Sequence, residues 1–196
     1  MDLTCSLRET AVEPPGTPPL PRAEPRDLPD DPFAGLDGDD ALTFDITAHL
    51  QAGQPMTPEL DALYRLWESK RADRAMPGRR DFAFEDLGPW LGHLILVDVL
   101  DHGRDYAFRI FGTRIAEFLG QDLTGKRLNM LSPRVQRAMG EEYGEVVATR
   151  RPRYIVGSPH LSRRFSVAAR AILPLSHAGC AVDQLLIGFY EAKNRR

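Results

Sequence analysis

The sequence predicts an α+β protein: a five-stranded antiparallel sheet with helices on one face, preceded by an amphipathic helix and a disordered N-terminal tail. Three observations carry this prediction. Apolar residues recur with helical spacing in some segments and run or alternate with strand spacing in five others. The strand segments within each group are joined by short turns. Short connections require antiparallel neighbours, so a single antiparallel sheet is the simplest product.

The first 50 residues are expected to form an acidic, Pro-rich and mostly disordered tail. Eight prolines occur by Pro32, and 11 acidic residues stand against three arginines. Such a segment cannot bury enough apolar surface to offset the entropy of ordering. Its charge of −8 contrasts with +5 for the rest of the chain, giving −3 overall. The tail is interpreted as solvating, as a partner-binding arm, or as a segment that folds back onto basic residues.

Residues 40–50, DALTFDITAHL, form the first apolar cluster and suit either a short strand or a docking segment. The first strong helix signal follows at residues 57–72, where Thr57 suits the N-cap and Pro58 the first helical position. The helix has one apolar stripe, which either covers a sheet face or meets a second copy of the chain. The stripe consists of Leu60, Leu63, Tyr64 and Trp67.

A folded domain is expected over residues 81–192. Its first two strands, 93–100 and 106–112, are separated by the polar turn DHGRD and therefore predict a hairpin. A short helix at 113–120 and a long helix at 132–150, opened by Ser132 and Pro133, follow. The remaining strands are predicted at 153–158, 164–175 and 183–192.

The stretch GQDLTGKRL at 120–128 is similar to a phosphate-binding loop, in which a strand leads through glycines into a helix. Here a predicted helix ends at Gly120, and no adequate helix begins at Lys126. Arg127 occupies the position of the Ser or Thr that would bind magnesium. We therefore expect Gly120 to end a helix and Gly125 to turn the chain, and we reject a nucleotide triphosphatase.

The segment YAFRIFGTRIAEFLGQDLTGKRL resembles the second strand, first helix and following turn of a PAS domain. MPGRRDFAFEDLGPWLGHLILVDV before it and ILPLSHAGCAVDQLLIGFYE after it resemble matching segments of a bacterial family of short, stand-alone PAS proteins. The resemblance covers about residues 58–192. It implies the PAS fold and a sensory or protein-interaction role. It also implies dimerisation through the helix that precedes the first strand.

The resemblance leaves the cofactor unknown. Flavin photoreceptors of this family carry a reactive cysteine in G-x-N-C-R-F-L-Q, whereas this chain has GTRIAEFLGQ. Haem-binding members usually present a histidine from the long helix, and residues 132–150 contain none. The resemblance does place a small-ligand cavity between the sheet and the helices, where plain core packing is the alternative. Its expected lining is Tyr106, Phe108, Ile110, Ile115, Phe118, Met139, Tyr143 and Val147.

Arginines that flank two predicted strands form a candidate anion-binding patch, with solvated turns as the alternative. They are Arg150, Arg151, Arg153, Arg163 and Arg164. Nucleic acid is not an expected partner, because interleaved aromatic residues and a recognised motif are absent. No catalytic or metal-binding residue is assigned, since neither metal-ligand spacing nor a nucleophile elbow occurs.

These observations predict a non-enzymatic regulatory protein that binds a protein partner, itself as a homodimer, or a small ligand. Alternatives are a small enzyme that uses the cavity of the α+β fold and a ligand-free adaptor. No run of about 18 apolar residues predicts a membrane span. With only two cysteines, one of them in the tail, a reducing cytoplasmic location is expected.

Overall fold

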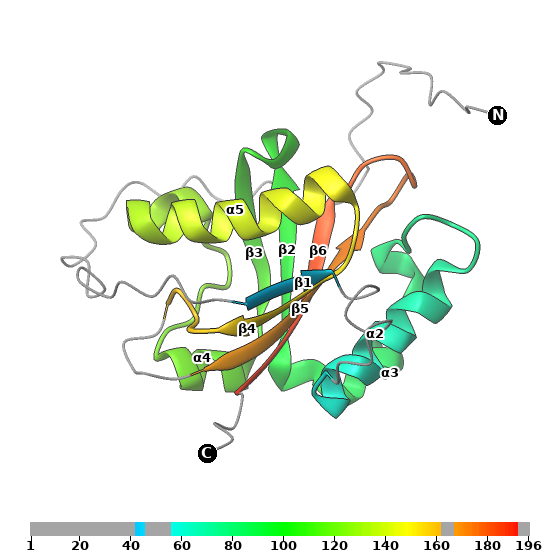
Figure 1. The fold of residues 1–196 in the computed structure, drawn as a ribbon, viewed down its shortest axis with the longest axis horizontal. Coiled ribbons are helices and arrows are strands. Elements are labelled where there is room, and N and C mark those ends of the chain that lie inside the picture. Colours follow the sequence, from blue (N-terminus) through cyan, green and yellow to red (C-terminus); the bar gives the residue numbers. More distant parts are fainter. Residues whose placement is uncertain (1–41, 46–55, 162–166, 192–196) are drawn as a thin grey trace.

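An antiparallel sheet with strand order β1-β4-β5-β6-β2-β3 forms the centre of the molecule (Figure 1). The computed structural model describes residues 42–45, 56–161 and 167–191. The strands are β1 (Leu42–Asp45), β2 (Leu94–Leu100), β3 (Asp105–Phe111), β4 (Arg153–Gly157), β5 (Ala168–Leu175) and β6 (Gln184–Glu191). The helices are α2 (Pro58–Arg71), α3 (Phe84–Leu87), α4 (Thr113–Leu119) and α5 (Pro133–Thr149), with 3₁₀ turns at Arg79–Asp81, Gly88–His93, Asp101–Gly103 and Leu128–Met130.

The prediction of an α+β fold with an antiparallel sheet is confirmed. All five predicted strands occur, and β2 and β3 form the expected hairpin. A sixth strand, β1, comes from the apolar cluster at 40–50 and pairs with β4. Of the two interpretations of that cluster, the strand is the one observed. The remainder of the 1–50 tail lies outside the described residues.

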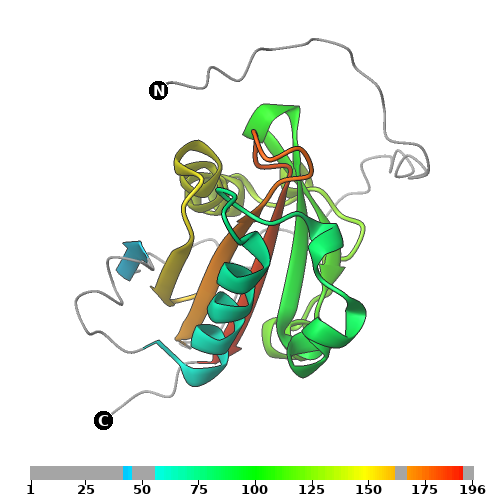
Figure 2. The same cartoon turned by 90° about the vertical axis from the view of Figure 1, so that its right-hand side faces the viewer.

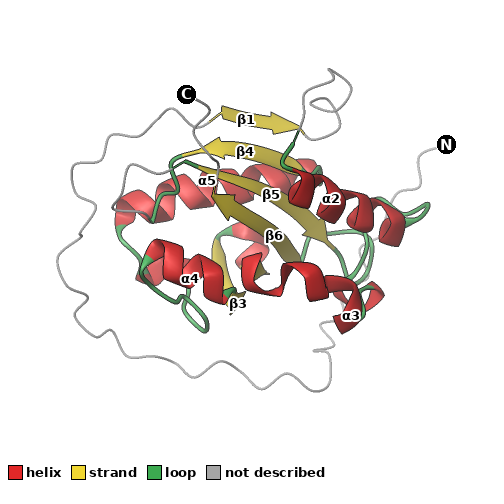
Figure 3. Ribbon diagram, turned by 90° about the horizontal axis from the view of Figure 1, so that it is seen from below, coloured by secondary structure: helices red, strands yellow, loops and turns green. Residues whose placement is uncertain are grey.

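Two helices cover opposite faces of the sheet, as Figures 2 and 3 show. On β6, Gly188 lies directly against α2, because an added Cβ would come within 2.5 Å of Leu60 and 2.6 Å of Leu63. Gly188 is paired with Ala171, so both face α2. The residue before Ala171 on β5 is Arg170, which points to the other face and donates a hydrogen bond to Glu142 of α5. Successive strand residues point to opposite faces. We call the α5 side the inner face.

The stretch that is similar to a phosphate-binding loop instead pairs with the outer edge of β3. The Gly125 N–H donates to the Phe108 carbonyl over 2.8 Å, and the Phe108 N–H donates to the Lys126 carbonyl over 2.9 Å. Gly120 ends α4 and Gly125 turns the chain, with φ of 74° and 79° respectively. The Gly125 N–H is therefore committed to the sheet, which agrees with the expectation from the sequence.

Candidate functional site

A small cavity lies between the inner face of the sheet and α5. Its volume is about 20 Å³, which is enough for a water molecule. Ligand pockets in proteins are typically about 300–1,000 Å³, so the cavity in this conformation does not accommodate a flavin or a haem. The lining is mostly apolar but includes three ionisable side chains: Glu142, His160 and Arg170.

These three side chains form one buried cluster contributed by different elements. Glu142 comes from α5, Arg170 from the inner face of β5, and His160 from the segment that follows β4. The two terminal nitrogens of Arg170 each donate to a different oxygen of Glu142, both over 3.1 Å. The Nε2 atom of His160 lies 2.7 Å from Oε1 of Glu142. The cluster thus joins the helix, the sheet and a loop at a single carboxylate.

The electrostatic balance of the cluster favours an ionised Glu142. Burial alone would raise the pKa of this carboxyl group. The positive charge of Arg170 and the hydrogen bond with His160 act the other way, and the net effect is a pKa below the ordinary value. The buried Nε atom of Arg170 has no hydrogen-bond partner within the described part of the chain. That N–H is therefore available to an acceptor, such as a water molecule or a ligand.

Of the eight residues predicted to line a ligand cavity, two line the internal cavity and five pack around it. Met139 and Tyr143 do line the cavity. Phe108 and Ile115 are buried in the surrounding core, with 0% and 1% of their surface exposed. Phe118 packs its ring against Phe189. Val147 lies beside Gly103, in the turn between β2 and β3. The ring of Tyr106 packs edge-on against the ring of Tyr143.

The placement of Ile110 on the inner face is wrong. Ile110 pairs with Leu96, whereas Phe108 pairs with the next residue, Val97. Arg109 is therefore an extra residue in β3, and this bulge reverses the alternation of side chains beyond it. Ile110 consequently lies on the opposite face from Phe108, with 45% of its surface exposed.

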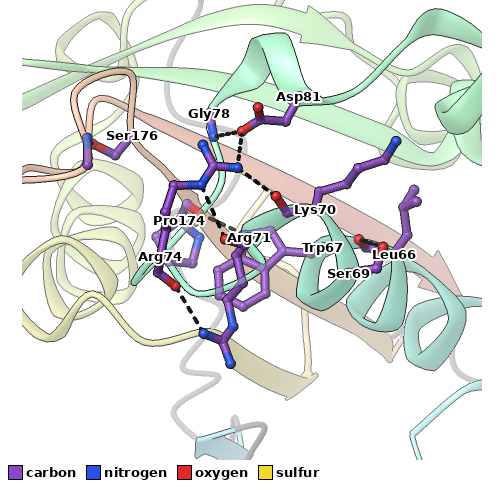
Figure 4. A network of polar contacts seen from close by, with 11 residues as sticks. Leu66, Trp67, Ser69, Lys70, Arg71, Arg74, Gly78, Asp81, Pro174 and Ser176 are labelled. Atoms are coloured by element: carbon purple, nitrogen blue, oxygen red, sulfur yellow. Dashed lines mark hydrogen bonds and ion pairs between the residues drawn. The ribbon is translucent and has the colours of Figure 1, made fainter.

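The apolar stripe of α2 covers the protein's own sheet. Leu60, Leu63, Tyr64 and Trp67 are all buried, at most 8% exposed. The indole N–H of Trp67 donates to the Pro174 carbonyl of β5 over 2.8 Å (Figure 4). The side chain of Arg74 bonds to the Lys70 and Arg71 carbonyls and to Asp81, which holds the end of α2 in place. In this arrangement these four residues are not available as a dimer interface.

Three of the five arginines of the predicted anion patch lie within the described residues, and two of these three are near carboxylates. Arg153 pairs with Glu145 of α5, and Arg151 lies 3.9 Å from Asp45 of β1. Arg150 is exposed and adopts a left-handed conformation where α5 ends. Arg163 and Arg164 lie outside the described residues.

The ionic cluster is not predicted by the sequence patterns described above. One signal was present: Arg170 interrupts an otherwise apolar strand, and a charged residue at such a position requires a buried partner. Its partner could not be identified, because Glu142 lies 28 positions away on a helix whose rotation about its axis the sequence does not specify.

The described residues contain no candidate metal centre and no candidate membrane span. Within the described residues, no group of three or more His, Cys, Asp or Glu side chains is arranged to hold a metal ion. No helix in the same part of the chain has the length and apolar character needed to cross a bilayer.

A single antiparallel sheet that faces a long helix across a small cavity places the chain in the class of α+β domains. Comparison with protein families gives a specific assignment: the model of the PAS domain family matches residues 56–187. The chain therefore belongs to the PAS domain family, whose members in general have sensory or regulatory roles. Searches of curated proteins and of solved structures gave no match.

Proposed function

We propose that this chain is a non-catalytic regulatory protein that binds a protein partner, and that a small polar ligand beside Glu142, His160 and Arg170 controls this binding. The observation that carries the proposal is the unpartnered Nε of Arg170 at the cavity. A donor in that position favours a ligand that carries an acceptor, because a buried N–H without a partner is costly.

The size of the cavity links ligand binding to a movement of α5. A space of about 20 Å³ admits a water molecule but no metabolite. A larger ligand can enter only if a wall of the cavity moves, and we propose that this wall is α5, with Arg170 then sharing its donors between Glu142 and the ligand. A ligand that binds the displaced arrangement better shifts the population toward it. The surface around α5 would then report occupancy to the partner.

Native mass spectrometry of freshly purified protein tests the proposal directly. The wild type is expected to retain a small molecule, and the double variant Glu142→Leu/Arg170→Met is expected to lose it while remaining folded. Affinity capture with each protein then compares the bound partners. A wild-type mass equal to that of the chain alone, together with identical captured proteins, would count against ligand control.

Catalysis is a second candidate, because a hydrogen-bonded carboxylate and imidazole are the groups that general acid–base catalysis uses. Glu142 and His160 meet this description over 2.7 Å. The existing volume admits water and no substrate, so this function also requires the cavity to enlarge. A screen for turnover that compares wild type with His160→Gln separates the candidates, since only an enzyme would show activity that the substitution abolishes.

A further inference from the structure

A second and larger hollow lies on the surface, away from the internal cavity. It is a groove of about 490 Å³ bounded by the 3₁₀ turns Asp101–Gly103 and Leu128–Met130, the start of β3 and the first half of α5. This volume falls within the range of about 300–1,000 Å³ that small-molecule sites occupy. The groove and the internal cavity have no lining residue in common.

Two buried polar groups at the groove lack hydrogen-bond partners within the described residues. Tyr106 is 1% exposed, and its hydroxyl group makes no hydrogen bond there. Asp105 is 7% exposed; its Oδ1 accepts the Asn129 N–H over 3.2 Å, but its Oδ2 accepts none. The nearest cation, on Arg127, lies 3.8 Å from Oδ2. Buried polar groups in native proteins are nearly always paired, so both atoms point to a ligand or to water.

Gly140 leaves the wall that α5 contributes to the groove without a side chain at that point. The groove is lined by Gly140, and a Cβ added there would meet no atom within 4 Å. One turn later, a Cβ at Gly144 would lie 3.9 Å from the Tyr106 hydroxyl, which is ordinary contact. Glycine makes the interior of a helix less stable than alanine does, and no neighbouring atom is close enough to exclude a Cβ at either position. Gly140 leaves open space in the wall of the groove, and Gly144 leaves room on α5 for the buried Tyr106 hydroxyl itself.

Two exposed arginines lie at the rim of the groove, and two carboxylates, of the buried Asp105 and of Glu141, balance their charge within the lining. Arg104 and Arg137 are both exposed and line it, and Arg137 makes no ion pair or hydrogen bond within the part of the chain described. Glu141 is the exposed acidic residue of the lining. Arginine is well suited to binding carboxylate and phosphate groups, because its planar guanidinium can donate two parallel hydrogen bonds.

We propose that this groove binds a small hydroxylated anion, a hydroxy acid or a sugar phosphate. The anionic group binds Arg104 and Arg137 at the rim, and the polar groups of the ligand pair separately with Asp105 Oδ2 and with the Tyr106 hydroxyl. This site is separate from the internal cavity and does not depend on ligand control through α5.

Amide chemical shifts measured during ligand titration test the proposal. The probes are ribose 5-phosphate, glycerol 3-phosphate and malate, with inorganic phosphate and ribose as fragments. At least one hydroxylated anion is expected to shift the amides of Gly103, Asp105 and Gly140, and to bind at least about tenfold more tightly than either fragment. The absence of shifts with all three anions overturns the proposal. Equal affinity for inorganic phosphate also overturns it, since it would indicate non-specific attraction of anions.

Four variants locate the binding. Gly140→Leu fills the groove without an initial clash and is expected to abolish the shifts, and Arg137→Ala is expected to weaken binding about tenfold. Tyr106→Phe is expected to weaken binding and to raise the melting temperature of the ligand-free protein, because it removes an unpaired buried hydroxyl. Arg114→Ala on α4 is the matched control and should bind normally. Unchanged affinity in both Gly140→Leu and Arg137→Ala would overturn the proposal.

The double variant Glu142→Leu/Arg170→Met separates this site from the internal one. It removes the polar cluster of the cavity and leaves every lining residue of the groove in place. Normal binding of the probe by this variant supports the groove as an independent site. Loss of binding in a folded double variant would place the ligand in the internal cavity and overturn the proposal.

Discussion

Arg170 and Glu142 form a two-pronged ion pair across the core, with each terminal guanidinium nitrogen 3.1 Å from a different carboxylate oxygen. The side chains are only 7% and 12% exposed. The pair connects the middle of β5 to the middle of α5, so it stabilises the observed position of the helix on the sheet. Removing one member of such a pair leaves an uncompensated buried charge, whereas apolar replacement of both members is often tolerated.

Glu142→Gln is therefore expected to lower the free energy of unfolding by about 3 kcal/mol, because Arg170 then retains its charge without a counter-ion. Urea unfolding monitored by circular dichroism measures the loss. The double variant Glu142→Leu/Arg170→Met should lose much less than the sum of the single changes. Additive losses would show that the two side chains are not energetically coupled.

Acid stability should depend on the same carboxylate. The pKa of Glu142 is lowered in the folded protein, so the group contributes stability above the unfolded-state value of about 4.3. This contribution is lost as the pH falls through the lower folded-state pKa, because the native state then takes up a proton against the field of Arg170. Urea midpoints between neutral pH and about pH 3 should fall less steeply in Glu142→Gln than in wild type. Parallel curves for the two proteins would exclude this role.

Trp67→Glu distinguishes between the two interpretations of the apolar stripe on α2. The structure buries Trp67 to 2% exposure against the protein's own sheet, so a charge there should cost about 3 kcal/mol or more and unfold much of the population. Circular dichroism and sedimentation velocity measure folding and association together. Arg65→Glu on the exposed side of the same helix is the control. A folded Trp67→Glu protein that sediments as a smaller species would instead place Trp67 in a dimer interface.

Gly188→Ala should destabilise the contact between α2 and the sheet by about 2 kcal/mol, because the added methyl group overlaps the buried leucines at positions 60 and 63. Gly140→Ala is the opposite case. Its methyl group meets open space, and the better helix propensity of alanine should add about 1 kcal/mol. Thermal unfolding of both variants provides the comparison. Equal shifts in the same direction would contradict the packing described for Gly188.

The predictions from sequence were accurate where a local pattern determines the structure. The hairpin of β2 and β3 and the helix that begins at Pro133 follow from apolar periodicity and from turn or cap residues. The bulge at Arg109 was not predictable in this way, because one extra residue changes no composition and yet moves Ile110 to the other face.

The ionic cluster required information of a different kind. Arg170 alone indicated a buried charge, but the identity of its partner depends on the register of β5 and on the rotation of α5 about its axis. The groove at Tyr106 likewise depends on three segments that meet only in the folded chain. Tyr106 packs against Tyr143 of α5, and no pattern in the sequence indicates that its hydroxyl group lacks a partner.

The segment that carries Gly125 and Lys126 has a consequence for aggregation. A bare outer strand offers its amide and carbonyl groups to any neighbouring molecule, and this is a common start of intermolecular sheet growth. Here both main-chain groups of Phe108 are already occupied by this segment. If this segment detached, the edge of β3 at Phe108 would be free to pair with a strand of another molecule. Resistance to this kind of self-assembly therefore depends on the loop that contains Gly125.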